Sequence, residues 1–425
     1  LLNGFFEKKW SVKWLACGYL LALVGAWYRI MQFMVVTALL SGIGLYYFLC
    51  LIKKEKHWKR YLVQNIGVFA ILFVLVFGFY YWDQQQYTSQ EWQDYKEFNT
   101  LRSELWDYGF PDYQKYQKEY NDLGLDDITV SLFQRWQSLD PDRLTIDVFQ
   151  KLVDLKDPKK IDGEFWKGFA KAMFFNIYQI PAFFLAVFSV ILWLVFNKRS
   201  RIETITVIYE ICMIILIYIY LYYQGRYFKD RVDMGLWLSV ALVVFWLLEK
   251  KNAAFSLQAG VVTCSILVIV SLYFAYPRFK ANLNYDDKKA KCEQIEELGQ
   301  DKEHLYLTKL LCVRVETGYG PLDRLPENVI ANLCPMGGWT SRSASDNEIL
   351  KRYNIRNPYK DMINNEKVYL VDNDIKTTIA YIQKWYSPDA KAEKVKEIVG
   401  CPVYKIVEKQ EEKKSDKKSV ADEET

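Results

Sequence analysis

Tyr222-Tyr223-Gln224-Gly225-Arg226-Tyr227-Phe228-Lys229-Asp230-Arg231 joins two long apolar runs, Ile205 to Tyr223 and Leu236 to Leu248. Both runs are apolar enough to enter a bilayer, whose hydrocarbon core is about 30 Å thick. So short a link cannot form a domain, and we therefore expect a tight loop between two membrane helices. The arginines of this loop then lie at the depth of the lipid headgroups.

The rest of the chain repeats this alternation of apolar runs and polar links. The overall composition, 51% apolar and 16% aromatic residues, does not reveal this alternation because it averages the apolar runs with the polar segments. The sequence predicts an α-helical polytopic membrane protein with about seven spans. The other five runs are Val12 to Trp27, Ile30 to Ile52, Tyr61 to Trp82, Ala172 to Phe196 and Phe255 to Tyr276.

We expect five parts along the chain. Residues 1–82 hold three spans, and residues 83–171 form an acidic helical loop. Residues 172–276 hold four spans, residues 277–407 form a small α/β domain, and residues 408–425 form a disordered charged tail.

Basic residues in the short loops set the predicted orientation, because such loops usually stay cytoplasmic. The basic segments Lys53 to Arg60, Lys198 to Arg201 and Lys250-Lys251 fall on one side of a seven-span chain. We therefore expect a multi-pass protein of the cell membrane with a cytoplasmic amino end. The acidic loop and the α/β domain are then extracytoplasmic.

Arg226 and Arg231 break this rule, because their loop faces outward, and Arg29 occupies another outward tip. One interpretation is that these cations extend to phospholipid headgroups beside Asp230 and Asp233. The other is that they hold the phosphate of a lipid-linked substrate. Arginine suits this role because its planar group stays charged and binds two phosphate oxygens at once.

The segment Gln224-Gly225-Arg226-Tyr227-Phe228 between two spans resembles a QGRYF-Leu-Pro motif of polytopic bacterial membrane proteins. Those proteins belong to the GT-C glycosyltransferase superfamily and its uncharacterised relatives. The layout of spans, acidic outer loop and outer carboxyl-terminal domain is also similar. The resemblance implies a polyprenyl-phosphate-linked sugar donor, used at the outer face of the membrane.

This chain departs from the family pattern in two places. Lys229-Asp230 stands where the relatives continue with Leu-Pro, and the outer loop that carries their acidic catalytic motif has no counterpart. The first residue is Leu1 rather than Met, so we expect the natural beginning to be missing.

The acidic segment predicts a small helical insert on the outer membrane surface. Asn99 to Tyr113 reads as a helix before a Gly-Pro turn, and helical spacing returns at Leu132 to Trp136 and at Thr145 to Leu155. Three carboxylates near aromatic residues are candidates for a general base that deprotonates an acceptor hydroxyl. The alternative is that they are helix caps and solvated faces. They are Glu104, Asp107 and Asp112.

The carboxyl-terminal region predicts a partly parallel sheet, because short β-rich runs alternate with helical ones. The β-rich runs are His304 to Leu307, Val329 to Leu333 and Val368 to Val371; the helical runs are Asp346 to Tyr353 and Asp374 to Tyr386. Val395 to Val399 and Val403 to Val407 predict a closing hairpin.

The loop Pro335 to Ser343 follows a predicted strand and precedes a helix, a position where open α/β sheets bind ligands. Gly337 and Gly338 would let the backbone approach a substrate, and Trp339 would stack on a sugar ring. The loop is also readable as a plain turn, since it matches neither a dinucleotide fingerprint nor a P-loop.

Cysteine and histidine usage narrows the chemistry. Only His57 and His304 are present, and no CxxC pair occurs, which argues against a zinc site and a Cys-His nucleophile. The sequence does not identify a cofactor. Four cysteines fall in the outer domain, where disulfides are permitted and three full pairings exist. These are Cys292, Cys312, Cys334 and Cys401.

Two functions from different classes follow. The first is an envelope glycosyltransferase acting on a lipid-phosphate sugar, with an envelope polymer as acceptor. The second is a non-catalytic membrane protein, such as a sensor, assembly factor or transporter part, with an outer binding domain. The spans hold few ionisable groups besides Glu210, which disfavours transport. The expected partners are membrane lipid, lipid-linked sugar and envelope polymer; the net charge of +4 gives no sign of nucleic-acid binding.

Overall fold

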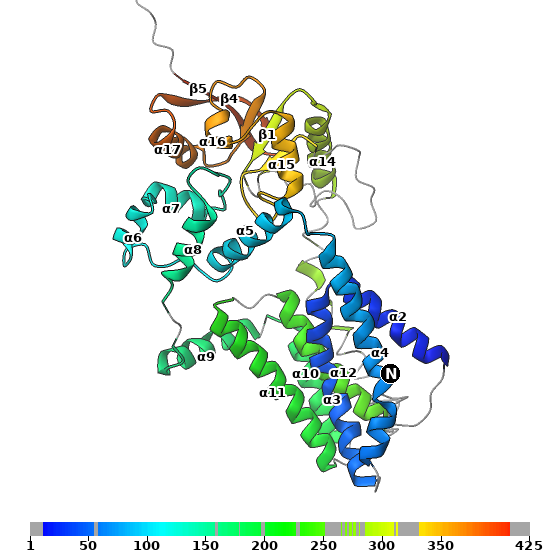
Figure 1. Cartoon of the computed structure of the whole chain (residues 1–425). Helices are drawn as coiled ribbons and strands as arrows, with labels where there is room; N and C mark the ends of the chain where they lie inside the picture. Colours follow the sequence, from blue (N-terminus) through cyan, green and yellow to red (C-terminus); the bar gives the residue numbers. More distant parts are fainter. Residues whose placement is uncertain are drawn as a thin grey trace, which may run out of the picture. The chain divides into compact units, whose positions relative to one another are not determined.

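The computed structural model divides the chain into two compact units, each described by itself (Figure 1). Unit 1 comprises Leu1–Ser89 and Pro158–Leu283, and unit 2 comprises Gln90–Asp157 and Asn284–Thr425. The structure describes residues 12–54, 58–157, 160–177, 179–196, 200–226, 230–250, 285–309, 312 and 331–408, with a few short pieces between 265 and 280.

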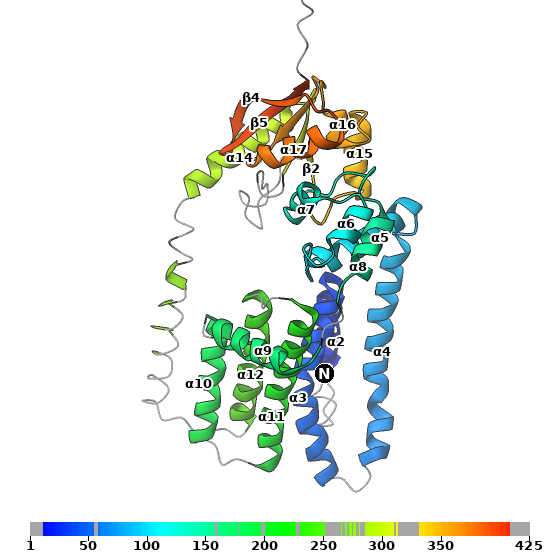
Figure 2. The same ribbon diagram turned by 90° about the vertical axis from the view of Figure 1, so that its left-hand side faces the viewer.

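Unit 1 is a bundle of helices. Helix α12 packs against α3, α10 and α11, and α2 packs against α3 and α4. Figures 1 and 2 both show α3, α10, α11 and α12 running side by side. Buried apolar side chains such as Leu39, Ile214 and Val243 fill the space between them. The helices are α2 (Val12–Tyr28), α3 (Ile30–Lys54), α4 (Trp58–Gln85), α9 (Gly163–Ile177), α10 (Pro181–Phe196), α11 (Arg201–Gln224) and α12 (Asp230–Lys250).

Three helical stretches among the described residues are long and apolar enough to cross a membrane. They are Phe33–Lys54, Arg201–Gln224 and Val232–Lys250. This finding supports a helical membrane protein. The predicted run Phe255 to Tyr276 lies largely outside the described residues, so the number of seven spans stays a prediction.

The predicted run Ala172 to Phe196 is not one straight helix. Helices α9 and α10 meet at an angle of 89°, and together they would make one further span. Pro181 is the first residue of α10. Proline lacks an N–H group and disfavours a helical conformation in the preceding residue, so the helix breaks before it.

Unit 2 is built on a five-stranded sheet with the order β2-β1-β3-β5-β4. Strand β1 pairs in parallel with β2 and β3, whereas β5 pairs antiparallel with β3 and β4. The partly parallel sheet and the closing hairpin are therefore confirmed. The predicted second strand, Val329 to Leu333, is displaced: residues 331 and 332 form a turn and only Leu333 belongs to β2, while residues 329 and 330 lie outside the described part. The strands are β1 (Leu305–Thr308), β2 (Leu333–Pro335), β3 (Val368–Val371), β4 (Ala390–Ile398) and β5 (Cys401–Glu408).

Side chains alternate between the two faces of this sheet, as the pleat requires. Leu305 and Leu307 enter one core, while Tyr306 enters a second core with Ile295 and Leu298 of helix α14. Helices cover the first face from both halves of unit 2. They are α5 (Gln90–Trp106), α6 (Gln117–Asp122), α7 (Asp127–Gln134), α8 (Ile146–Asp154), α15 (Ala344–Arg352), α16 (Pro358–Asp361) and α17 (Ile375–Trp385); α14 spans Tyr285–Gln300.

Residues 90–157 of the acidic segment belong to the same compact unit as the sheet, where the sequence suggested a separate insert on the membrane surface; residues 83–89 and 158–171 belong to unit 1. Phe133 and Phe149 of this segment share one core with Leu307 and Leu370 of the sheet. Helix α8 begins as predicted, because Thr145 accepts a hydrogen bond from the N–H group of Val148. The other two helices begin earlier than predicted: α5 at Gln90, and α7 at Asp127, where Asp126 accepts from the N–H group of Thr129.

Candidate functional site

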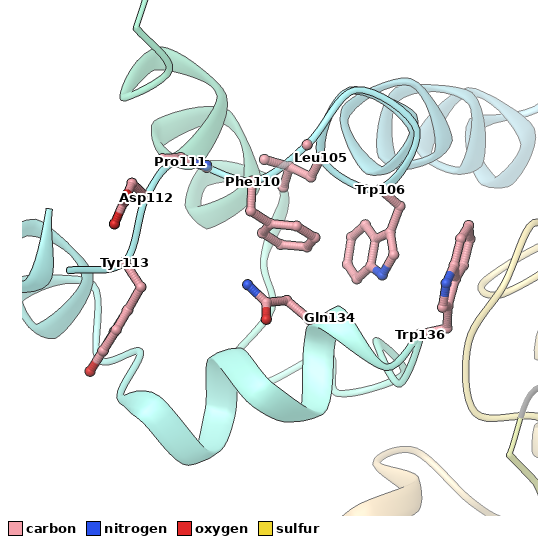
Figure 3. A pocket seen from close by; sticks show the side chains of 9 residues that line it. Leu105, Trp106, Phe110, Pro111, Asp112, Tyr113, Gln134 and Trp136 are labelled. Atoms are coloured by element: carbon pink, nitrogen blue, oxygen red, sulfur yellow. The ribbon is translucent and has the colours of Figure 1, made fainter. Parts of the chain in front are cut away.

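An aromatic cleft of about 380 Å³ opens in unit 2, where α5 and α7 end (Figure 3). Figure 3 shows the Trp106 and Trp136 rings side by side at one end, with the Gln134 amide beneath the Phe110 ring. Asp112 and Tyr113 lie at the other end. The residues that line this aromatic cleft are Leu105, Trp106, Gly109, Phe110, Pro111, Asp112, Tyr113, Gln134 and Trp136.

The aromatic rings of the cleft are fixed by one another and by the backbone. The rings of Trp106 and Trp136 have centroids 6.1 Å apart, and Phe110 packs edge-on to Trp106 at 4.9 Å. The Trp106 Nε1–H group donates a 2.8 Å hydrogen bond to the carbonyl oxygen of Phe133. The cleft therefore presents a preformed apolar surface.

Trp136 adopts a backbone conformation that usually belongs to glycine. Its φ angle is +66°, and it follows Arg135, the last capping residue of α7. Its N–H donates to Phe133 O at 2.8 Å, and the next N–H, of Gln137, donates to Leu132 O at 3.3 Å. Helices commonly end with glycine at this position. A bulky residue there costs about 1–3 kcal/mol of strain, and such strain clusters at functional sites.

The loop Pro335 to Ser343 was predicted to bind a ligand. In the structure it packs against the backbone at Trp136. A Cβ atom added to Gly337 would lie 1.6 Å from the carbonyl oxygen of Trp136. The N–H groups of Ser138 and Leu139 donate to Met336 O at 2.9 and 3.0 Å. Gly337 is thus needed for close backbone packing that holds Trp136 in place.

The two other predicted substrate residues of this loop lie near the aromatic cleft without lining it. Gly338 has a φ angle of +103°. Trp339 is 63% exposed and stands edge-on to Trp136, with centroids 6.3 Å apart. The Tyr95 hydroxyl donates to the Trp339 carbonyl at 2.7 Å. Trp339 therefore extends the row of aromatic rings beyond the cleft.

A buried polar network supports the chain just after Trp136. Asp140 is fully buried, and its carboxylate accepts 2.5 Å hydrogen bonds from the hydroxyls of Tyr381 and Tyr386. Arg342 donates to the carbonyl oxygens of Ser138 and Asp140 at 3.1 and 3.0 Å. Burial lowers the pKa of Arg342 to about 10, although Asp140 opposes that shift, so this cation stays charged at neutral pH.

Of the three predicted general bases, only Asp112 lines the aromatic cleft. One of its oxygens, Oδ1, accepts hydrogen bonds from the N–H groups of Gln114 and Lys115, so it also shapes a turn. The Glu104 carboxylate lies 3.8 Å from the Lys156 ammonium. Asp107 lies in the turn after α5 and interacts electrostatically with Arg102.

Arg29 lines a second cleft, of about 350 Å³, in unit 1. The exposed Arg29 shares this Arg29 cleft with Trp27, Tyr28, Tyr80 and Asp83. Aromatic residues and a cation at a helix end are typical of the membrane interface.

Arg226 lies at the same end of unit 1 as Arg29. Gly42 contacts Glu210, and Tyr46 lies within electrostatic reach of Glu203, so α3 and α11 run antiparallel. The start of α3 is therefore near the end of α11. Arg226 is exposed there, and Gly225 with φ of +82° ends the helix before it. The side chain of Arg231 lies outside the described residues.

Sequence reasoning missed Trp106, Trp136 and Gln134 as a common site. Helix α7 ends at Gln134, and the residue two positions later, Trp136, has the left-handed backbone conformation. The sequence offers no glycine or asparagine there. The missing glycine or asparagine at this helix end was the one sequence feature that could have pointed to Trp136. Within the part of the chain that the structure describes, no three side chains of His, Cys, Asp or Glu gather as metal ligands.

Comparisons with protein-family models, with curated proteins and with solved structures give no match to this chain. Its function is therefore inferred from the residues themselves.

Proposed function

We propose that this is an integral membrane protein whose unit 2 binds a carbohydrate chain in the aromatic cleft, outside the membrane. The observation that carries the proposal is the strained Trp136, whose indole lines the cleft beside Trp106. Glycine at that helix end would avoid the strain but would leave no ring.

The chemistry of the lining suits a sugar. A pyranose ring has apolar C–H faces, which pack on aromatic rings, and a rim of hydroxyl groups. The Gln134 amide supplies both a donor and an acceptor. The Oδ2 atom of Asp112, which accepts no hydrogen bond from the described residues, would accept one from a sugar hydroxyl. A volume of about 380 Å³ accommodates a small ligand or a short segment of a chain.

The test is direct binding by the full-length protein in detergent. Chitotetraose and cellotetraose serve as soluble probes, and tryptophan fluorescence reports occupancy of a cleft that contains two indoles. We expect saturable binding of at least one probe, weakened roughly tenfold or more by Trp106→Ala, since stacking on an aromatic ring is worth ~1–3 kcal/mol.

Trp385→Ala is the matched control. Trp385 is half-buried in unit 2, away from the aromatic cleft, and its Nε1–H donates to Thr129. Its replacement removes an indole of similar burial and should leave the affinity unchanged. Equal loss of binding in both variants would point to a general effect on folding and would contradict a site at the cleft.

A second proposal keeps the glycosyltransferase hypothesis, with a polyprenyl-phosphate-linked sugar as donor. It is supported by Arg29 and Arg226 at one end of unit 1, where they would hold an anionic headgroup, and by Asp112 in the aromatic cleft as base. Asp112→Asn tests it, because asparagine can form the same turn without a basic carboxylate. Transfer of labelled sugar from a polyprenyl phosphate should fall at least about a hundredfold, while oligosaccharide binding persists.

A further inference from the structure

Two cysteines that are distant in sequence meet in the core on the α14 side of the sheet. Cys312 and Cys401 are both buried thiols in the cluster that contains Val371 and Ile398. The Cys401 Sγ atom lies 3.5 Å from the Cys312 carbonyl oxygen. The two thiol side chains also interact electrostatically.

The backbone fixes both positions. Cys401 is the first residue of β5 and follows the tight turn at Val399 and Gly400, which have φ angles of +54° and +76°. Cys312 follows β1 shortly after Lys309, whose carbonyl accepts its N–H at 3.0 Å.

We propose that Cys312 and Cys401 form the disulfide of unit 2. Cys334 is separated from them, because β2 points its side chain into the core on the opposite face of the sheet. Bonding would tie the segment after β1 to the closing hairpin. The pair does not touch the aromatic cleft, so the proposal is independent of the proposed function.

The chemistry is thiol–disulfide exchange with an exogenous disulfide such as oxidised glutathione. One cysteine thiolate attacks that disulfide, forms a mixed disulfide and releases one glutathione thiol. The second cysteine thiolate then attacks the protein-bound sulfur and releases the other. In total two protein thiols lose two protons and two electrons, and one exogenous disulfide becomes two thiols.

Burial governs how fast this happens. It raises the pKa of Cys312 to about 12, and the adjacent Cys401 adds to the shift, so the reactive thiolate is scarce in the folded protein. Exchange in the folded state is therefore slow, and the reaction needs an alkaline buffer and a long incubation.

The test is peptide mapping of the full-length protein after overnight incubation with oxidised glutathione at pH 8.5, followed by alkylation of the remaining thiols. We expect one cross-linked peptide that contains Cys312 and Cys401, and Cys334 recovered as an alkylated thiol. The unfolding midpoint of unit 2 should rise by roughly 4–16 °C over the reduced protein.

Two variants sharpen the assignment. Cys401→Ser should abolish the cross-linked peptide, and Cys334→Ser should leave it intact. The main measurement uses the natural chain, so it stands even if a variant folds poorly. Recovery of Cys312 and Cys401 as free thiols or separate glutathione adducts, or a bridge from either to Cys292 or Cys334, would overturn the proposal.

Discussion

Gly337 packs so tightly on Trp136 that a Cβ atom at position 337 would lie 1.6 Å from the Trp136 carbonyl oxygen. This approach joins the loop after β2 to the end of α7, two segments from different halves of unit 2. The position of Trp136, which lines one end of the cleft, therefore depends on a glycine that lies outside the cleft.

Gly337→Ala should destabilise unit 2 by about 1–3 kcal/mol or more, because the backbone of one segment must move. The measurement is thermal unfolding of the full-length protein, monitored by tryptophan fluorescence. Gly163→Ala is the control: Gly163 begins α9, and nothing lies within 4 Å of its added Cβ. An unchanged midpoint for Gly337→Ala would contradict the close packing.

Local patterns predicted much of unit 2. The strand at Val368 to Val371, the hairpin around Gly400 and the start of α8 at Thr145 each depend on neighbours within a few residues. Pro181 also carried a local signal for the break before α10, although the apolar run of Ala172 to Phe196 concealed it.

The aromatic cleft and its support could not be predicted in this way. Asp140 meets Tyr381 across 241 positions of sequence, and no periodicity encodes such a pairing. The left-handed conformation of Trp136 is likewise imposed by tertiary packing, since tryptophan itself does not favour it. The sequence placed Asp112 near aromatic residues, but only the fold brings Trp136 to them.

Asp346 makes the stability of unit 2 depend on pH. Its side chain is 6% exposed, and its Oδ2 atom has no hydrogen-bond partner among the described residues. Burial raises its pKa to about 7, against the lowering effect of a hydrogen bond from Thr340. The folded state therefore holds a proton that the unfolded chain releases above about pH 4, and stability falls as pH rises from about 4 to 7.

Asp346→Asn should remove this dependence. At pH 8 the variant should be more stable than the natural protein by about 2–4 kcal/mol, and the difference should nearly vanish at pH 4. The measurement is the unfolding midpoint of the variant and of the natural protein between pH 4 and pH 8. A variant that is less stable than the natural protein at pH 8 would show that the carboxylate is stabilised there.

Tyr381→Phe tests the buried network behind the cleft. The substitution removes a 2.5 Å hydrogen bond to the Asp140 carboxylate, which keeps only its other donors. Hydrogen bonds to charged groups contribute about 1.5–3 kcal/mol, so unit 2 should lose that much stability. The unfolding midpoint of the full-length protein measures the loss. An unchanged midpoint would contradict a stabilising role for the hydrogen bond between Tyr381 and Asp140.

Arg29→Gln and Arg226→Gln should weaken binding of a polyprenyl phosphate by at least about threefold each, since each removes a charge-assisted contact. Native mass spectrometry of the purified protein with this lipid measures the bound fraction. The matched control is Arg60→Gln, an exposed arginine in the first turn of α4 at the other end of that helix from Asp83. Equal binding by all three variants and the natural protein would end the phosphate hypothesis.

Trp136→Gly tests the central claim most directly, because it relieves the strained φ angle and removes the ring in one change. Titration of the full-length protein with chitotetraose and cellotetraose, beside its unfolding midpoint, separates the two effects. We predict that the carbohydrate affinity falls at least tenfold while the stability changes by less than about 2 kcal/mol. Undiminished carbohydrate binding by a folded Trp136→Gly protein would contradict the assignment of the aromatic cleft as the binding site.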